Sequence, residues 1–467
     1  MNKNGKLEKR RRDVWLLVIL LALGLACLVL PEAAESRTSD GTFVATEWVR
    51  RYNGPANSSD YATAMALDGQ GNIYVTGVSW SGTSADFLTI KYSPDGRRLW
   101  TRRYNSPEDY YDKTTAMAVD GQGNVLVTGY SVKKWDRMNP SSTVIVTVKY
   151  DTNGQFLWER RYEGPVSDPY DNPSAIAVDA QGNVFVSGES YGGATGMDYA
   201  TVKYSSDGEE LWVRRYNGPA NGYDGATAMG VDGQGNVYVT GESDNFGKTP
   251  DFLTIKYSPG GQQIWVRRCK DALPRAISVD GQGTVYITGN SWSAGNSDFL
   301  TVKYSPEGQR LWVRRYNGPA NLGDAPSAIA VDVQGNVFVT GVSYGNGTDD
   351  DFATIKYSPE GRRLWVRRYN GPANDCDSPK AMALDGQGNV YVTGYSVGLN
   401  TSSDYATIKY SPDGRRLWVK RYNGAGNDYD SPTSIAVDGQ GNVYVTGESE
   451  GSGSSNDYLT IKYTQTP

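Results

Sequence analysis

A repeat of about fifty residues is the feature that most constrains what this chain can fold into. Each copy carries a marker tryptophan, followed in half of the copies by Val-Arg-Arg-Tyr and in the others by a close variant of it. No helical pattern lies between the tryptophans, and a period near fifty without helices is the signature of propeller blades. The eight marker residues are Trp48, Trp100, Trp158, Trp212, Trp265, Trp312, Trp365 and Trp418.

Each copy contains four short runs rich in Val, Ile, Thr and Tyr, which are typical of strands buried between neighbouring sheets. In the copy that starts at Trp212, the runs cover 212–216, 226–232, 236–241 and 251–257. The segments 232–236 and 258–261 between them are rich in Gly, Asn, Asp and Pro, which supply the backbone angles of tight turns. The runs are therefore expected to pair as antiparallel hairpins.

The two ends of the chain complement each other. The first copy opens with a lone strand at 47–52, whereas the last copy ends after 457–463 without its outer strand. If the N-terminal strand completes the last sheet, no edge is left open. We therefore predict an all-β fold, an eight-bladed β-propeller of four-stranded antiparallel blades, with the ring closed by an N-terminal outer strand. A seven-bladed ring would leave one apolar blade uncovered.

The N-terminal segment has the pattern of an export signal or anchor. Six Lys and Arg residues lie within 1–13, and 14–30 is an unbroken apolar run. We predict a signal peptide or N-terminal membrane anchor at 1–36, a short linker at 37–46 and the propeller at 47–467. Whether the segment is cleaved stays open. The propeller is expected to be extracytoplasmic, that is secreted, periplasmic or at the cell surface, and to meet a membrane only through this segment.

The composition excludes several classes of function. The chain has no histidine, which removes His-based nucleophilic catalysis and His-ligated metals. Its net charge of −6 disfavours nucleic acid, which needs a basic surface. Of the three cysteines, Cys27 lies in the apolar N-terminal run, and Cys269 and Cys376 lie at non-matching positions of different copies, so no disulfide framework is predicted. We predict no cofactor, no metal and a monomeric propeller.

The recurring pattern resembles a known repeat. The run YDSPTSIAVDGQGNVYVTG at 429–447, followed by DYLTIKY at 457–463, is similar to the bacterial SBBP β-propeller repeat. That resemblance covers 47–463 and implies exported or cell-surface proteins without a defined reaction. A looser similarity to PQQ-type propeller repeats rests on Asp413-Gly414 and Leu417-Trp418, but the cofactor contacts of quinoproteins are not found.

Two sets of aspartates recur around the repeat. Rings of carboxylates could bind Ca²⁺, but a residue present in nearly every copy is more simply a turn cap or a partner for the repeated Arg and Lys. The first set precedes the strand that ends in Lys-Tyr: Asp86, Asp198, Asp251, Asp298, Asp351, Asp404 and Asp457. The second set lies in the loops between copies: Asp60, Asp112, Asp171, Asp224, Asp324, Asp377 and Asp430.

A binding site must be asymmetric, so departures from the repeat are the better candidates. The second copy has a long charged loop at 130–143, and the fifth copy has a shortened connection at 269–275. Other loops of the same face carry aromatic residues beside small polar ones, a combination that suits glycan or peptide recognition. The candidate ligand-binding residues are Trp80, Lys134, Trp135, Arg137, Lys270, Arg275, Trp292 and Tyr344.

The function that this pattern favours is a non-catalytic binding or scaffold module for a glycan, a peptide or a protein. No catalytic residue is identified. The alternative is an extracytoplasmic enzyme, either a carboxylate-based glycosidase or lyase or a quinoprotein-like protein. A glycosidase would need two acidic side chains about 5–10 Å apart across a cleft.

Overall fold

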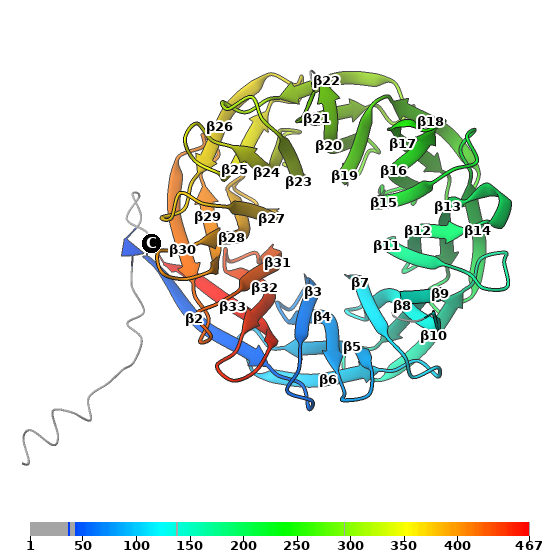
Figure 1. Cartoon of the computed structure of the whole chain (residues 1–467), viewed down its shortest axis with the longest axis horizontal. Coiled ribbons are helices and arrows are strands. Elements are labelled where there is room, and N and C mark those ends of the chain that lie inside the picture. Colours follow the sequence, from blue (N-terminus) through cyan, green and yellow to red (C-terminus); the bar gives the residue numbers. More distant parts are fainter. Residues whose placement is uncertain (1–35, 38–42, 137–138, 294, 467) are drawn as a thin grey trace, which may run out of the picture. The chain divides into compact units, whose positions relative to one another are not determined.

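The computed structural model describes residues 36–37, 43–136, 139–293 and 295–466. In this part of the chain, eight four-stranded antiparallel sheets follow one another around a common axis (Figure 1). We number these blades 1 to 8 in chain order, with β3–β6 as blade 1 and β31–β33 with β2 as blade 8. The predicted number of blades, and of strands in each, is confirmed.

The strands of each blade run outward from the axis in chain order. The innermost strands, from blade 1 to blade 8, are β3 (Asp60–Leu67), β7 (Asp112–Val119), β11 (Asp171–Val178), β15 (Asp224–Val231), β19 (Ala272–Val279), β23 (Asp324–Val331), β27 (Asp377–Leu384) and β31 (Asp430–Val437). The second strands are β4 (Ile73–Trp80), β8 (Val125–Asp136), β12 (Val184–Tyr191), β16 (Val237–Asn245), β20 (Val285–Ser293), β24 (Val337–Tyr344), β28 (Val390–Val397) and β32 (Val443–Glu450).

The outer half of each blade follows the same order. The third strands are β5 (Ala85–Tyr92), β9 (Asn139–Tyr150), β13 (Met197–Tyr204), β17 (Lys248–Tyr257), β21 (Asn296–Tyr304), β25 (Asp350–Tyr357), β29 (Ser403–Tyr410) and β33 (Asn456–Thr466). The outermost strands are β6 (Arg98–Tyr104), β10 (Phe156–Tyr162), β14 (Glu210–Tyr216), β18 (Gln263–Cys269), β22 (Arg310–Tyr316), β26 (Arg363–Tyr369), β30 (Arg416–Tyr422) and β2 (Phe43–Tyr52). A two-residue strand β1 (Ser36–Arg37) and a 3₁₀ turn η1 (Gly193–Thr195) complete the elements.

The core lies between blades rather than within one sheet. The second and third strands are almost fully buried because both of their faces contact a neighbouring blade. Ile73 and Leu88 of blade 1, for example, pack against Tyr444 and Tyr458 of blade 8. Branched and aromatic side chains fill such two-sided positions well. Each joint therefore depends on both blades that form it.

The Asp-Gly-Gln-Gly-Asn segments form the predicted tight turns. In blade 1 the backbone N–H groups of Gln70 and Asn72 both donate to Asp68 Oδ1 at 2.9 Å, and Asn72 Nδ2 donates to Asp68 Oδ2 at 2.8 Å. Gly71 has a φ of 77°, a conformation that glycine adopts at low cost. These turns and the outer hairpin turns lie at one end of the strands, which we call the turn face. The opposite end is the loop face.

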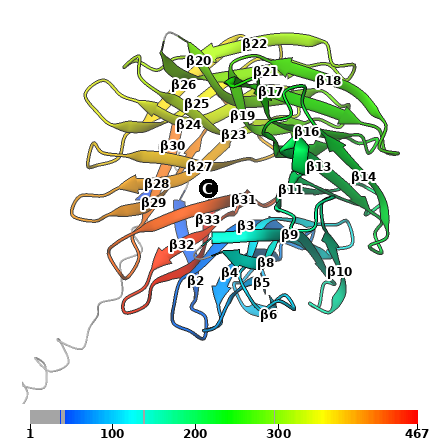
Figure 2. The same ribbon diagram turned by 45° about the vertical axis from the view of Figure 1, so that its right-hand side comes forward.

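Blade 8 closes the ring as predicted. Strand β2 pairs antiparallel with β33 from Phe43 to Tyr52, so the N-terminal strand is the outer strand of the C-terminal blade (Figures 1 and 2). Strand β2 begins at Phe43, inside the segment predicted as a linker at 37–46. At the start of this strand, Val44 lies opposite Gln465 and Ala45 lies opposite Thr464. Pairing with the C-terminal tail therefore extends the blade beyond the repeat itself.

A side chain completes the closure. In blades 1 to 6, one Lys and one Trp donate to a backbone carbonyl in the outer turn of the next blade. Lys91 Nζ and Trp100 Nε1, for instance, reach Thr152 O at 3.0 and 3.1 Å. Blade 8 has no such turn, because its outer strand comes from the other end of the chain. There Gln465 Oε1 accepts from Lys409 Nζ at 2.7 Å and from Trp418 Nε1 at 3.1 Å. The glutamine amide takes the place of the missing main-chain carbonyl.

The predicted signal peptide or anchor at 1–36 falls almost entirely on residues outside the described part of the chain. Within the described ranges, no helix is both long and apolar enough to cross a membrane.

Candidate functional site

Both predicted sets of aspartates belong to the framework of the blades. In the loops between blades, each aspartate accepts a backbone N–H from a residue six or seven positions upstream. Asp112, for example, accepts from Ser106 N at 2.7 Å and Asp224 from Gly218 N at 2.7 Å. Blade 5 has Ala272 at this position, where the connection is too short to need a cap. The aspartates of the first set lie near the start of the third strands and pair with arginines of the outer strands: Asp457 with Arg51, Asp86 with Arg103, Asp198 with Arg215, Asp251 with Arg268, Asp351 with Arg368 and Asp404 with Arg421.

Burial raises the pKa values of the aspartates that cap the loops between blades. It raises the pKa of Asp377 to about 6, although hydrogen bonds from Ser396 and from the Gly371 N–H act in the opposite direction. The pKa values of Asp60 and Asp224 are also raised by burial. These carboxylates are enclosed structural groups, and a soluble ligand would have to displace the loops that they hold.

Between the framework positions lies one cross-strand pair that changes from blade to blade. In blade 1 this pair is Tyr61 and Val78, flanked by the pairs Asp60 with Ser79 and Ala62 with Gly77. The flanking Ser and Gly are identical in all eight blades. The pairs of blades 2 to 8 are Lys113 with Tyr130, Asn172 with Glu189, Gly225 with Glu242, Leu273 with Asn290, Ala325 with Val342, Ser378 with Tyr395 and Ser431 with Glu448.

No two of these eight pairs are alike. They lie near the loop-face end of the two innermost strands of each blade. The innermost strands of neighbouring blades surround the axis of the ring (Figure 1). We call the eight pairs the variable ring. A position that varies within an otherwise constant repeat is not needed for the fold, and repeat proteins place their binding residues at such positions on a shared surface.

Aromatic residues gather at the variable ring of blades 1 and 2. The hydroxyls of Tyr61 and Tyr111 lie 3.0 Å apart. The Tyr111 ring is 6.2 Å from the Trp80 ring and 6.4 Å from the Tyr130 ring, measured between centroids. Burial, together with the neighbouring Tyr111 and Tyr170 side chains, raises the pKa of Tyr130 to about 12. Tyr130 is therefore neutral near pH 7, and this cluster presents phenol hydroxyls beside aromatic rings that are tilted relative to one another.

Blades 3 and 4 contribute carboxylates. Glu189 accepts a hydrogen bond from the Tyr223 hydroxyl and another from Asn172 Nδ2 at 3.0 Å. Glu242 is half-buried, and burial raises its pKa; the charge of Arg275 opposes this shift and that of Glu189 adds to it. Arg275 Nε donates to Asn290 Oδ1 at 3.2 Å. Five successive blades, 1 to 5, thus contribute aromatic, acidic and basic groups to this side of the ring.

The other side of the ring has a different character. In blade 7, Lys380 Nζ lies 5.0 Å from the centroid of Tyr395, whose ring is 6.4 Å from that of Tyr429. In blade 8, burial raises the pKa of Glu448, which accepts from Asn456 Nδ2 at 2.8 Å. Blade 6 offers only Ala325 and Val342. The variable ring is therefore chemically uneven around the axis.

Two of the candidate residues predicted from sequence belong to this surface. Trp80 packs against Tyr111, and Arg275 is exposed beside Glu242 and Asn290. The long loop of blade 2 is an extension of the β8–β9 hairpin. Lys134 Nζ of this hairpin lies 3.6 Å from Asp168 Oδ2, and Trp135 is exposed. Arg137 lies outside the described residues.

The remaining candidates are spread over blades 5 and 6. Lys270 and Trp292 are exposed, and Tyr344 lies near Asp349 and Asp350, whose charges raise its pKa. The raised loop of blade 2 and the shortened connection of blade 5 are separated in the ring by blades 3 and 4. The structure does not bring these residues into one cluster, and their role in binding stays a prediction.

Sequence reasoning missed Glu189, Glu242, Glu448, Tyr61, Tyr111 and Tyr130. The carboxylates and Tyr130 directly follow the repeated Val-Thr-Gly or Val-Ser-Gly run, so they look like ordinary strand residues. Comparing the eight copies column by column would have revealed them, because their column varies while its neighbours do not.

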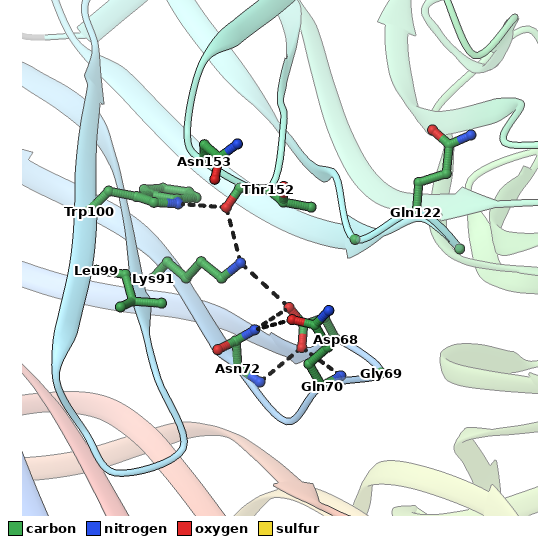
Figure 3. A pocket seen from close by; sticks show the side chains of 12 residues that line it. Asp68, Gly69, Gln70, Asn72, Lys91, Leu99, Trp100, Gln122, Thr152 and Asn153 are labelled. Carbon is green, nitrogen blue, oxygen red and sulfur yellow. Dashed lines mark hydrogen bonds and ion pairs between the residues drawn. The ribbon is translucent and has the colours of Figure 1, made fainter.

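Grooves also occur on the turn face. One lies between blades 1 and 2 and is lined by Lys91, Leu99, Trp100 and the two glycine-rich turns (Figure 3). Equivalent grooves lie between blades 2 and 3 and between blades 4 and 5. Lys91 and Trp100 are already bonded to Thr152 O, and Lys91 Nζ lies 3.5 Å from Asp68. These grooves are repeated features of the blade joints whose polar groups satisfy one another.

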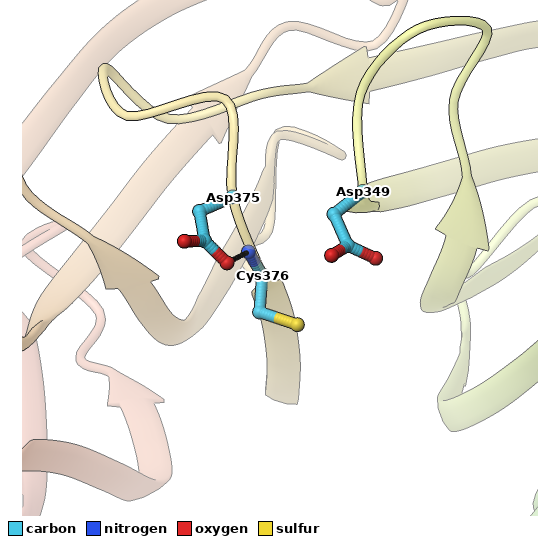
Figure 4. Close-up of side chains that lie close together, drawn as sticks. All are labelled: Asp349, Asp375 and Cys376. Carbon is cyan, nitrogen blue, oxygen red and sulfur yellow. Dashed lines mark hydrogen bonds between the residues drawn. The ribbon is translucent and has the colours of Figure 1, made fainter.

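Asp349, Asp375 and Cys376 form a small cluster on the loop face, with their donor atoms within 4.8 Å of one another (Figure 4). Both carboxylates are exposed. Burial and the nearby Asp349, Asp350 and Asp375 raise the pKa of the Cys376 thiol, whereas metal binding needs the thiolate. The cluster by itself does not define a metal site.

Comparison with known proteins agrees with the repeat pattern. The model of the SBBP β-propeller repeat matches residues 47–82, 364–399 and 417–453. The chain therefore contains segments that match the SBBP β-propeller repeat at three places. This confirms the resemblance seen in the sequence. The matched segments each join an outer strand to the two innermost strands of the following blade, so the SBBP repeat includes the variable pair.

One curated relative is an uncharacterized WD repeat-containing protein of Acanthamoeba polyphaga mimivirus, 25% identical over 503 aligned residues. The alignment covers 88% of this chain but 34% of that protein, so the chain spans about a third of its relative. Among solved structures, the Dos1 propeller has a TM-score of 0.54 at 9% identity, covering 88% of this chain and 94% of that one. Sqt1 from Chaetomium thermophilum has a TM-score of 0.53 at 9% identity, covering 88% and 99%. These likenesses concern the fold alone.

Proposed function

We propose that this protein is a non-catalytic binding module whose variable ring recognises a peptide, a glycan or a protein at the loop face. The observation that carries the proposal is a cross-strand pair that differs in every blade, although the Ser and Gly on either side of it are the same in all eight. An enzyme would need a few reacting groups at one point, whereas eight different pairs around an axis suit recognition of an extended surface.

The proposal includes an extracytoplasmic location. It is supported by the basic segment and apolar run that precede the propeller in the sequence. Cell fractionation with an antibody against the propeller tests this part: protease added to intact cells or spheroplasts should degrade the protein, and full protection would overturn the proposed location.

The binding role is tested with the whole chain on peptide and glycan arrays. We expect retained ligands whose binding falls at least tenfold when Tyr111 and Glu189 are both changed to alanine. The matched control is Gln122→Ala with Glu210→Ala, two exposed residues of the same blades on the turn face and outer strand. Equal losses in both double variants, or no retained ligand at all, would contradict the role of the ring.

A carboxylate-based enzyme remains the second candidate because Glu189 and Glu242 influence each other electrostatically across neighbouring blades. Release of reducing ends from an array-selected glycan, lost in Glu242→Gln, would favour this alternative. Binding without turnover would favour the module.

A further inference from the structure

Glu242 lacks a strong internal partner. Among the residues that the structure describes, no hydrogen bond or ion pair reaches its carboxylate, and Arg275 and Glu189 act on it only through their charges. The cross-strand neighbour of Glu242 is Gly225, which has no side chain to cover it. A half-buried carboxylate in this position is costly unless a cation completes it.

Glu189 of the adjacent blade 3 is fixed by hydrogen bonds at the joint between blades 3 and 4. The Tyr223 hydroxyl and Asn172 Nδ2 bond its two carboxylate oxygens, which fixes the side chain without supplying a positive charge. Tyr223 itself lies in the field of both Glu189 and Glu242. Two negative groups and one neutral phenol therefore meet where blades 3 and 4 join.

Aromatic rings continue this surface toward blade 2. Tyr130 and Tyr111 lie with their centroids 6.4 Å apart, and Tyr170 is close enough to influence Tyr130. Ring faces attract cations, most strongly when the site is partly removed from water. The surface formed by Tyr111, Tyr130, Glu189, Tyr223 and Glu242, which we call the acidic-aromatic arc, thus combines the two kinds of group that bind organic cations.

Blade 7 contains an example of a cation placed over a tyrosine ring at this position. Tyr395 occupies the same position in its blade as Tyr130 does in blade 2, and the protein's own Lys380 lies over it at 5.0 Å. The residue equivalent to Lys380 in blade 2 is Thr115, which carries no charge. Lys113 is the cross-strand neighbour of Tyr130, yet no cation contact with this ring occurs among the described residues. Blade 2 thus has the ring without the cation.

We propose that the acidic-aromatic arc binds a Lys or Arg side chain of a polypeptide partner, an inference that rests on the proposed binding function of the variable ring. The ammonium or guanidinium group lies between the carboxylates of Glu189 and Glu242, beside the Tyr223 ring, and the Tyr111 and Tyr130 rings offer further aromatic surface to the partner chain. Surrounding acidic residues on the loop face, such as Asp109 and Asp244, favour the approach of a basic chain.

The test uses the whole chain and three fluorescent peptides, acetylated and amidated, in which Gly alternates with Lys, Arg or Gln. Fluorescence anisotropy at low salt should give binding of the Lys and Arg peptides at least tenfold tighter than of the Gln peptide. The double variant E189Q with E242Q should lose most of this difference. The control E209Q with E210Q, two exposed carboxylates at the start of an outer strand, should keep it.

A second variant separates electrostatics from structure. K113Q removes a positive charge beside Tyr130, so the affinity for the Lys peptide should increase severalfold. A folding defect would not increase the affinity. Equal affinity for all three peptides, or equal losses in both double variants, would overturn the cation site.

The outcomes also separate this inference from the proposed function. If array-selected neutral peptides or glycans bind through Tyr111 and Glu189 but the Lys and Arg peptides do not, the ring is a binding surface and the cation inference is wrong. If no ligand of any kind depends on the ring, both are wrong.

Discussion

Removal of the Gln465 side chain tests how the ring is closed. In Gln465→Ala, Lys409 Nζ and Trp418 Nε1 each lose the acceptor that a turn carbonyl provides in blades 1 to 6. A hydrogen bond from a charged donor contributes about 2 kcal/mol and a neutral one about 1 kcal/mol, so we expect the variant to lose about 3 kcal/mol of unfolding free energy. For a propeller of this size, that corresponds to a fall in Tm of about 3 °C.

Differential scanning calorimetry and hydrogen exchange measure the two consequences. Besides the lower Tm, amide exchange should accelerate in β2 and β33 while blade 4 keeps its protection, because only one joint is weakened. Gln465→Glu keeps an acceptor for both donors and should lose less. Gln263→Ala, an exposed glutamine on an outer strand, is the control. An unchanged Tm together with unchanged exchange in β2 would refute the closure by Gln465.

Three further predictions concern the framework. Because burial raises the pKa of Asp377 to about 6, the stability that this group contributes is complete below pH 4 and is lost as the pH rises through 6. We therefore expect the unfolding free energy of Asp377→Asn, measured with urea, to rise by about 2 kcal/mol relative to that of the wild type between pH 4 and pH 7. The same difference between the two proteins at both pH values would show that the pKa of Asp377 is ordinary. Gly77→Ala should prevent folding or destabilise by more than about 3 kcal/mol, because its Cβ would lie 2.0 Å from Tyr61 O, and a circular dichroism melt like that of the wild type would contradict this. Arg103→Met should cost about 3 kcal/mol by leaving Asp86 buried without its ion pair at 2.7 Å, whereas a loss below about 0.5 kcal/mol in the same assay would mean that the pair is unimportant.

Much of the fold could be predicted because the same pattern of strands and turns occurs in eight copies. The period, the four strand-like runs and the two glycine-rich turns fix the blade, and the missing outer strand of the last copy fixes the closure. Strand β14 of blade 3 begins at Glu210 and strand β15 of blade 4 at Asp224, in each case two residues before the run seen in the sequence. The reason is that Asp224 caps the preceding loop and still pairs with Ser243.

Features that depend on distant partners could not be predicted. Val44 was placed in a linker, yet it is fully buried in one cluster with Leu417 and Trp418 because the tail at Gln465 pairs with it. The substitution of a glutamine side chain for a turn carbonyl likewise requires knowing which turn is missing. Neither is visible in a local sequence pattern.

The candidate site was found only in part for a similar reason. Trp80 and Arg275 stood out because they are unusual residues in loops or shortened connections. Glu189, Glu242 and Tyr130 occupy a regular strand position, and only the packing of one blade against the next shows that this position lies at a partly exposed joint. Unusual loops are easy to recognise in a sequence, whereas the variable position of a regular strand is recognised only when the copies are compared in the folded ring.

The central claim is that the variable ring serves recognition rather than folding. It is tested most directly by giving blades 2, 3 and 4 the residue that blade 6 carries, in a triple variant with Tyr130, Glu189 and Glu242 each changed to Val, as at Val342. We predict a Tm within about 3 °C of the wild type together with loss of the array-selected ligand. A collapsed Tm, or an intact Tm with unchanged ligand binding, would contradict the account.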